Sequence, residues 1–373
     1  MRILHVAEVT HGGVVSLVQT FAQLQTAAGH DVHVLVRPEV GDVAGTRHTW
    51  TPARRNPREL VAAEATLRRV VREVRPDVVH LHSFFPGLLG RLRALPGRPA
   101  VVYQPHSFAF AALPPRLAWA VTAVERRATR FTDRMVTNCQ DERVEGESRG
   151  IRTPTTVIGL PVDTDRFAPT DGDRGSLRAD LGLTAGFVVV CVGRLSRQKG
   201  QRALAVAWEA TQPEDSVLLL VGPGDQQEIA DAAPTTFGRS LLCVGAQDDV
   251  RPWLWAASVS VLPSLYEGQS VAMAEALACG VPVVMTDVNG GREAVCPDGV
   301  EPAGAVVDVG DLDALLAELE RRRTHPELLA REAAQARVRA EALFHPATVI
   351  ARLEGSYTEA IARARQRSPR RSS

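Results

Sequence analysis

Residues 187–200 read FVVVCVGRLSRQKG, an apolar run followed by a glycine, three basic side chains and a second glycine. The run predicts a buried strand, and the glycines predict a tight turn into a helix. Lys199 is the only lysine of the chain. Arg194 and Lys199, beside loop amides and a helix N-terminus, form a setting that suits a diphosphate. Taken alone, the window equally allows an exposed lysine that binds nothing.

The same alternation of short apolar runs and amphipathic stretches extends over most of the chain. It is typical of βαβ units and a parallel sheet. Residues 14–28 form a predicted helix that Gly29 ends. The predicted strands are residues 2–6, 32–36, 78–81, 100–103, 135–137, 155–158, 188–192, 217–221, 241–244, 259–262, 281–285 and 305–307. The fold class is therefore α/β, with two Rossmann-like domains that bind ligands beyond the carboxyl ends of their strands.

Residues 159–175 contain two prolines and a polar run, which favours a domain boundary there. We expect a first domain in residues 1–160, a second in residues 161–345, and a C-terminal helix with a basic tail in residues 346–373. The helix can cross back to the first domain. Residues 363–373 are basic and predicted to be disordered, and a solvated end is favoured over contact with anionic lipid.

Composition narrows the functional classes. The 373 residues are 45% hydrophobic and 23% charged, with a formal net charge of zero, so no basic surface marks a nucleic-acid binder. No apolar run approaches the roughly 18 residues of a membrane span, and residues 1–6 are typical of a strand, not of a signal peptide. The five cysteines form no C-x-x-C pair. We expect a cytoplasmic protein with reduced thiols and at most weak peripheral membrane contact.

Residues 263–284, PSLYEGQSVAMAEALACGVPVV, carry the second cluster of chemistry. Glu267 lies in a predicted loop after a strand, and a predicted helix begins near Ser270. Glu275 lies about five residues into that helix, or about 7–8 Å along its axis. The first helix amides can hold phosphate. One carboxylate can therefore meet sugar hydroxyls and the other a ribose diol, with the phosphates between them.

Here the sequence resembles a known family. Glu267 and Glu275 resemble the Glu-x7-Glu signature of family-4 retaining glycosyltransferases of the GT-B fold. Residues 193–200 are similar to the donor-diphosphate loop of that family, and residues 157–169 to its interdomain sequence. Residues 11–14 resemble its glycine-rich loop, and residues 77–82 and 105–107 resemble two further motifs. The matches run in family order from residue 2 to about residue 310. The resemblance implies two Rossmann-like domains whose parallel sheets face each other across a cleft.

The resemblance also implies a function. It implies transfer of a hexosyl group from a nucleoside-diphosphate sugar, with UDP favoured and GDP next, to an acceptor hydroxyl. The anomeric configuration would be retained, with no metal and no cofactor. The acceptor would be a small molecule, a glycan or a lipid-linked sugar, because acceptor loops carry no transferable code. The implied site residues are His106, Arg194, Lys199 and Glu267 as catalytic residues; Gly12, Gly13, Gly193, Gly268, Gln269, Ser270, Val271, Ala272, Glu275, Gly290, Gly291 and Glu293 for the donor; and His82 on the acceptor side.

Three histidines of the first domain need separate treatment. The resemblance places His106 at the end of the fourth strand beside the donor sugar, although a packed histidine is the alternative. We expect His80 and His82 to project from opposite sides of one strand, so that they form no metal site by themselves. We interpret His82 as an acceptor-side residue and His80 as structural.

Departures from the family pattern leave alternatives open. Gln269 and Ser270 stand where the family often has Phe-Gly, which puts the identity of the donor in doubt. Asp-x-Asp pairs occur, but none follows a strand as a metal-binding pair would. One alternative is a catalytically degenerate protein that binds sugar nucleotides. Another is an NAD(P)-dependent oxidoreductase, which would need a third glycine after Gly12 and Gly13 and an acid where Arg37 stands.

Overall fold

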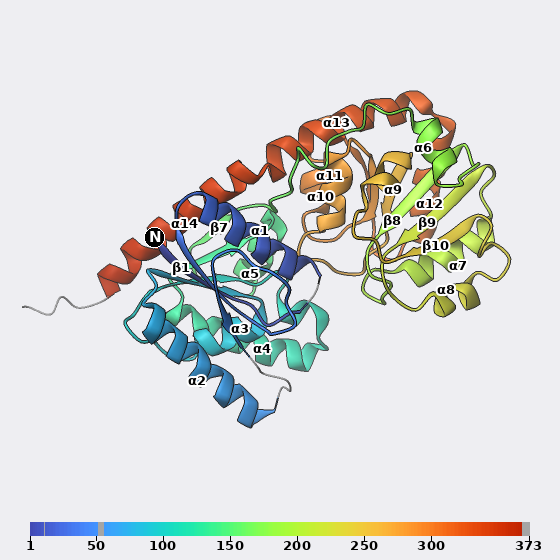
Figure 1. Cartoon of the computed structure of the whole chain (residues 1–373). Coiled ribbons are helices and arrows are strands. Elements are labelled where there is room, and N and C mark those ends of the chain that lie inside the picture. The colour runs from blue at the N-terminus through green and yellow to red at the C-terminus, as the bar shows by residue number, and fades with distance from the viewer. Residues whose placement is uncertain (11, 51–55, 368–373) are drawn as a thin grey trace, which may run out of the picture. The chain divides into compact units, whose positions relative to one another are not determined.

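The computed structural model describes residues 1–10, 12–50 and 56–367, and the chain forms two compact units. Unit 1 comprises Met1–Pro161 and Pro346–Ser373, and unit 2 comprises Val162–His345. Each unit has a parallel sheet with helices packed against it (Figure 1). Among the described residues, no helix combines the length and the apolar character that a membrane span requires.

Unit 1 is built on a seven-stranded sheet with the strand order β3-β2-β1-β4-β5-β6-β7, and every neighbouring pair is parallel. Its strands are β1 (Arg2–Val6), β2 (Asp31–Val36), β3 (Thr46–Thr49), β4 (Val78–His82), β5 (Ala100–Gln104), β6 (Arg134–Thr137) and β7 (Thr155–Val157). Its helices include α1 (Gly13–Ala27), α2 (Pro57–Val74), α3 (Phe84–Gly90), α4 (Pro115–Ala128) and α5 (Gln140–Ser148), with short 3-10 helices η1 (Ala109–Ala112) and η2 (Thr129–Phe131). Every residue of β4 and β5 is buried, as expected for central parallel strands.

Side-chain alternation along β1 divides the core of unit 1 into two layers. Leu4 packs in a cluster with Leu67 of α2, on one face of the sheet. Val34 of β2 packs in a second cluster with Val18 of α1, on the other face. His5 follows Leu4 and therefore points to the opposite face, toward α1. This face carries the histidines described below.

Helix α14 (Pro346–Arg367) brings the end of the chain back to unit 1, where it contacts β4, β5, β6, β7 and α1 (Figure 1). Its buried residues Val349, Leu353, Tyr357 and Ala360 recur at helical spacing and form one apolar stripe.

The last turn of α14 corrects one prediction. Residues 363–367 were expected in a disordered tail, but they are helical. The Arg367 guanidinium donates hydrogen bonds of 3.3 Å to the backbone carbonyls of Arg130 and Thr132 and lies 3.2 Å from an Asp133 carboxylate oxygen. These partners lie in the segment between β5 and β6, far from Arg367 in the sequence. The local sequence of the tail therefore could not predict the contacts that order this turn. Residues 368–373, also predicted to be disordered, lie outside the described residues.

Unit 2 is built on a six-stranded parallel sheet with the order β10-β9-β8-β11-β12-β13. Its strands are β8 (Phe187–Val192), β9 (Ser216–Val221), β10 (Leu241–Gly245), β11 (Val259–Leu262), β12 (Val283–Thr286) and β13 (Gly304–Val307). Its helices are α6 (Arg174–Asp180), α7 (Gln201–Thr211), α8 (Gln226–Ala232), α9 (Arg251–Ala256), α10 (Val271–Ala278), α11 (Gly291–Val295), α12 (Leu312–Thr324) and α13 (Pro326–Phe344). Four of these helices begin at a side chain that accepts a backbone N–H, namely Asp173, Asp225, Ser270 and Asp311.

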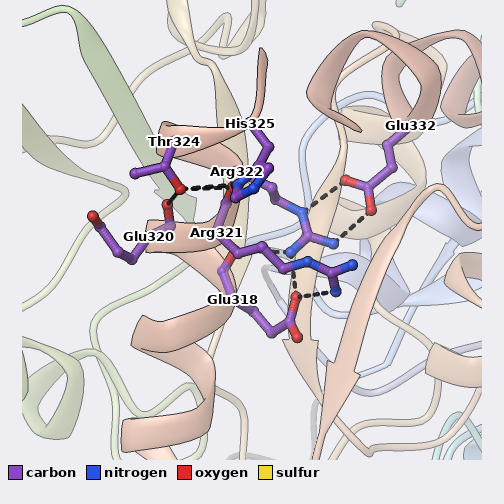
Figure 2. A network of polar contacts seen from close by, with 7 residues as sticks. All are labelled: Glu318, Glu320, Arg321, Arg322, Thr324, His325 and Glu332. Atoms are coloured by element: carbon purple, nitrogen blue, oxygen red, sulfur yellow. Dashed lines mark hydrogen bonds and ion pairs between the residues drawn. The ribbon is translucent and has the colours of Figure 1, made fainter. Parts of the chain in front are cut away.

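A buried ion pair joins α12 to α13 in unit 2 (Figure 2). The Arg322 Nε and Nη2 atoms donate to the two carboxylate oxygens of Glu332 at 2.7 and 2.6 Å, and Nη1 donates to Glu318 at 2.6 Å. Further along α13, Arg337 donates to the backbone carbonyl of Ala278 at 3.0 Å, at the end of α10. Helix α13, joined to α12 by this ion pair, therefore packs against the helix that carries Glu275.

The predicted α/β architecture with two Rossmann-like domains is confirmed. In each sheet the strand order reverses beside the first strand, at β1/β4 in unit 1 and at β8/β11 in unit 2. Ligands in such sheets bind beyond the carboxyl ends of the strands at that reversal. The strand that sequence analysis missed is β3, whose residues Thr46–Thr49 are polar and which pairs with β2 at the edge of the sheet.

Candidate functional site

The loop after β8 is held against the end of β11. Gly200 has φ +73°, and a Cβ there would lie 2.1 Å from the Pro263 carbonyl oxygen, so only glycine fits. The buried Gln201 side chain donates to the Arg194 carbonyl at 3.1 Å and accepts from the Ser196 amide at 3.3 Å. The β8 and β11 loops are thus brought together at the strand-order reversal of unit 2.

Lys199 and Glu267 form an ion pair in this position. The Lys199 Nζ lies 2.6 Å from Glu267 Oε1, which also accepts a 3.0 Å hydrogen bond from the Ser264 hydroxyl. The loops are joined by the backbone as well, since the Leu265 amide donates to the Gln198 carbonyl at 2.8 Å. Sequence analysis assigned these two side chains to the phosphate and the sugar separately. The structure brings them into contact.

Arg194 and Gly193 open the same loop. Gly193 is followed by an exposed Arg194, whose guanidinium makes no ion pair with any described residue. Gly222, at the end of β9, packs so tightly on this turn that a Cβ would lie 2.3 Å from the Gly193 carbonyl oxygen. The loop backbone is therefore well supported, while the charge of Arg194 stays available to a ligand.

The N-terminus of α10 lies directly after Glu267 and Gly268. The Ser270 hydroxyl accepts from the Met273 amide at 3.3 Å, while the amides of Val271 and Ala272 have no acceptor within the helix. The Gln269 side chain is buried, and its Oε1 atom has no hydrogen-bond partner among the residues that the structure describes. Two backbone donors and one buried amide oxygen thus stand at the predicted phosphate position.

Glu275, one turn further along α10, is half-buried and makes no hydrogen bond or ion pair with any described residue. Burial raises the pKa of its carboxyl group to about 7, the Arg166 charge opposes this shift, and the Asp249 charge adds to it. Sequence analysis did not assign Arg166 or Asp249 to the site. Arg166 could have been found, because it belongs to the interdomain sequence that resembles the family.

A third loop, after β12, completes this edge of unit 2. Gly290 has φ +78° and precedes α11, and a Cβ on Gly291 would lie 3.2 Å from the Met285 methyl group. The Thr286 hydroxyl donates to the Ser264 carbonyl at 2.5 Å and so links this loop to the Glu267 loop. Glu293 lies in α11 and is half-buried.

In unit 1 the prediction for His80 and His82 was wrong. Residues two apart in a strand point to the same face, and the two imidazole rings lie 4.0 Å apart between centroids. His5 of β1 pairs in register with His80 and contacts both rings. Sequence analysis missed His5, although the reversed strand order of a Rossmann sheet places β1 beside β4.

These histidines form a buried chain of hydrogen bonds. Gln25 Oε1 of α1 lies 2.7 Å from His5 Nε2, His5 Nδ1 lies 2.9 Å from His82 Nε2, and His82 Nδ1 lies 3.0 Å from His106 Nε2. His80 lies beside this chain, with its Nδ1 2.7 Å from the Tyr357 hydroxyl of α14. The chain therefore connects α1 with the loop after β5, which carries His106.

Burial keeps the four imidazoles neutral. It lowers the pKa of His5 to about 4 and that of His106 to about 3, and it lowers the pKa of His80 and His82 well below their usual value. The ligand atoms of His5, His80 and His82 lie within 4.8 Å of one another, a composition that suits a transition metal. Both ring nitrogens of His5 and of His82 already take part in this chain of hydrogen bonds, so a cation bound by these rings would have to displace some of them.

The loop that presents His106 is held in an unusual backbone conformation. His106 has φ +54° and Ser107 has φ +84°, which residues other than glycine seldom adopt. The buried Glu142 carboxylate accepts from the Ser107 amide at 2.6 Å and from the Asn138 amide at 2.9 Å. This carboxylate fixes the loop and hence the position of His106.

The loop after β1 contains Gly12, which has φ +91° and precedes α1. An added Cβ at Gly12 would meet no atom of the described residues within 4 Å, so the backbone angle, and not crowding by those residues, favours glycine there. Gly13 is the first residue of α1. His11, the first residue of the 11–14 loop, lies outside the described residues.

Comparison with known proteins decides the family. Residues 11–166 match the model of Glycosyltransferase Family 4, and residues 186–323 match that of Glycosyl transferases group 1. The chain belongs to the family-4 glycosyltransferases. It is 31% identical over 269 residues to an Escherichia coli UDP-Gal:alpha-D-GlcNAc-diphosphoundecaprenol alpha-1,3-galactosyltransferase, with 69% of this chain and 68% of the relative covered.

Two further comparisons bear on this glycosyltransferase. It is 30% identical over 284 residues to a GDP-mannose-dependent alpha-(1-6)-phosphatidylinositol monomannoside mannosyltransferase of Mycolicibacterium smegmatis, covering 70% of this chain and 72% of the relative. The solved structure of Anabaena Alr3699/HepE in complex with UDP and glucose superposes with a TM-score of 0.81 at 20% identity, covering 96% of this chain and 99% of that one. The structural likeness supports the predicted GT-B fold.

Proposed function

We propose that this glycosyltransferase moves a hexosyl group from a nucleoside-diphosphate sugar to an acceptor hydroxyl, with retention of configuration and without a metal. The observation that carries the proposal is the ion pair of Lys199 with Glu267 at the strand-order reversal of unit 2, followed in α10 by Glu275, whose carboxyl group has no hydrogen-bond or ion-pair partner among the described residues. A UDP-galactose and a GDP-mannose enzyme are both among its relatives. A UDP-sugar remains our first choice of donor and a GDP-sugar our second.

In this proposal the residues of unit 2 bind the donor. Arg194 and Lys199 neutralise the departing diphosphate, where negative charge collects in the transition state. Lys199 has three N–H donors, so it can donate to phosphate while it remains bound to Glu267. Glu267 accepts hydrogen bonds from hydroxyl groups of the transferred sugar. Glu275 accepts from the ribose diol. Around these groups the donor is bound by Gly193, Gly268, Gln269, Ser270, Val271, Ala272, Gly290, Gly291 and Glu293.

The proposed roles in unit 1 follow the same resemblance. Gly12 and Gly13 let backbone amides approach the phosphates, His106 contacts the transferred sugar, and His82 lies on the acceptor side. No side chain acts as a nucleophile. The acceptor attacks from the face that the diphosphate leaves, and a phosphate oxygen takes the acceptor proton. The protein contributes orientation and fixed charge.

The proposed partners are a nucleotide sugar and a small-molecule, glycan or lipid-linked acceptor. We also propose a cytoplasmic location and no cofactor. The five cysteines are free thiols, which suits a reducing compartment.

A ligand panel tests the donor proposal. Thermal unfolding of the whole chain is followed with UDP, GDP, ADP and their sugars, in the presence and absence of EDTA. One nucleotide at about 100 times its Kd should stabilise the fold by about 2.7 kcal/mol. EDTA should leave that shift unchanged. The exposed Glu301 provides a control, Glu301→Gln, that should respond like wild type. Equal melting temperatures with every nucleotide would contradict the proposal.

A further inference from the structure

The hydrogen-bond chain from Gln25 to His106 has a direction that its chemistry determines. A neutral imidazole has one N–H donor and one acceptor nitrogen. An amide oxygen only accepts, so the 2.7 Å contact with Gln25 Oε1 requires the proton of His5 on Nε2. His5 Nδ1 is then an acceptor. The tautomer of each histidine then determines the tautomer of the next histidine in the chain.

The same reasoning continues through the two following contacts. His82 Nε2 must donate to His5 Nδ1 across 2.9 Å, which leaves His82 Nδ1 as an acceptor. His106 Nε2 must then donate to His82 Nδ1 across 3.0 Å. His106 Nδ1 is left with a free lone pair. If the amide of Gln25 were turned over, all three protons would change sides and His106 Nδ1 would become a donor.

The surroundings allow this chain to act as one unit. Gln25, His5 and His82 have no solvent-exposed surface, so water cannot supply a substitute donor or acceptor. Burial also lowers the pKa of each ring, so the extra proton that would erase the direction is not held near neutral pH. His106 alone is half-buried, and its Nδ1 has no partner among the described residues. The chain thus ends at a ring that can meet a ligand.

We propose that Gln25, His5 and His82 are positioning residues that lock His106 in the Nε2–H tautomer, so that its Nδ1 accepts a hydrogen bond from a hydroxyl group of the sugar. This inference deepens the proposed function and rests on it for the identity of the ligand. A locked acceptor favours a hydroxyl, which can donate, over a carbonyl or phosphate oxygen, which cannot. A ring free to change tautomer could accept from a hydroxyl or donate to a carbonyl or phosphate oxygen, and would bind either group.

The direction of the chain can be measured on the ligand-free protein. Whole chain labelled with ¹⁵N-histidine is studied by two-bond ¹H–¹⁵N correlation spectra at pH 7.5, which distinguish a protonated from an unprotonated ring nitrogen. His5→Gln, His82→Gln and His106→Gln assign the signals. The expected result is an Nε2–H tautomer at all three rings. An Nδ1–H tautomer or a mixture at His106 would overturn the lock, whether or not the protein binds nucleotide sugars.

A pair of variants then tests the role of Gln25. Gln25→Met keeps the length of the side chain but replaces the amide oxygen with a weakly accepting thioether sulfur, and should let His106 populate both tautomers. Gln23→Met, on the exposed side of α1, should leave the spectrum unchanged. An unchanged His106 signal in a folded Gln25→Met protein would refute the role of Gln25. If that variant does not fold, the wild-type spectrum still decides the direction of the chain.

Calorimetry connects the tautomer with recognition. The nucleotide sugar that most stabilises the wild type is compared with its nucleoside diphosphate. Gln25→Met should reduce the ratio of their affinities by about twofold to tenfold, the value of one hydrogen bond, while affinity for the diphosphate itself stays the same. A changed tautomer with an unchanged ratio would refute the hydroxyl contact.

Discussion

The carboxyl group of Glu275 lies in surroundings that disfavour its charged form. It is half-buried, it has no hydrogen-bond or ion-pair partner among the described residues, and burial raises its pKa from 4.5 to about 7. Between these two pH values the folded protein holds a proton that the unfolded chain has lost. Its contribution to stability is therefore complete below about pH 4.5 and is lost as the pH rises through 7.

The size of this effect on the free energy of unfolding follows from the pKa shift of Glu275. A difference of about 2.5 pKa units at about 1.36 kcal/mol each corresponds to about 3 kcal/mol over the full titration. Between pH 5 and pH 8.5 the expected loss of unfolding free energy is about 2–3 kcal/mol. The Gln side chain of Glu275→Gln has the same shape as Glu but does not titrate. The difference in unfolding free energy between wild type and variant should therefore change by this amount between pH 5 and pH 8.5.

Urea unfolding of the whole chain at pH 5, 6, 7 and 8.5 provides the measurement. The variant should gain stability relative to wild type as the pH rises, and Glu301→Gln, at an exposed position, should run parallel to wild type. The same substitution should have the opposite effect on nucleotide binding, which it should weaken. Loss of a charged acceptor should weaken UDP or GDP binding about tenfold to a hundredfold. If wild type and Glu275→Gln showed the same pH dependence of stability, the unsatisfied-carboxyl argument would be wrong.

Three further substitutions test the remaining structure. Lys199→Ala should lower turnover of the donor at least 10²-fold, measured as release of nucleoside diphosphate, because a fixed positive charge is lost; turnover within a few-fold of wild type would contradict its role. Gly200→Ala should lower the free energy of unfolding by more than about 1 kcal/mol, since its Cβ would lie 2.1 Å from the Pro263 carbonyl oxygen in a left-handed conformation; an unchanged melting temperature would show that this loop is not rigid. Glu332→Gln should cost about 3 kcal/mol because it leaves Arg322 poorly paired, whereas the double variant Arg322→Met/Glu332→Leu should recover much of that loss; equal stability of single and double variants would contradict this.

The strands and both donor-side motifs were predictable because their signals are local. A continuous apolar run such as residues 187–192 needs only its own side chains to indicate a strand buried on both faces. The turn at Gly193, the cap at Ser270 and the spacing of Glu267 and Glu275 are likewise local. The polar residues of β3 gave no such signal, because an edge strand is stabilised by its backbone bonds to β2.

Contacts between distant segments needed the folded chain. Lys199 and Glu267 are 68 residues apart in the sequence and lie in two different loops. Their ion pair depends on β8 and β11 being neighbouring strands. The face on which His80 and His82 lie could have been derived from strand geometry alone. Their link to Gln25 and His5 could not, because it requires a definite packing of α1 on the sheet.

The amino-acid order thus specified a family-4 glycosyltransferase with two parallel α/β units, since hydrophobic periodicity, glycine positions and motif spacing act over a few residues at a time. Tertiary packing alone decided that Lys199 is held by a carboxylate, that Glu275 has no partner within the described part of the chain, and that three imidazoles form one hydrogen-bonded chain. Each of these depends on groups far apart in the chain meeting in a buried place, where an unsatisfied charge or proton is expensive.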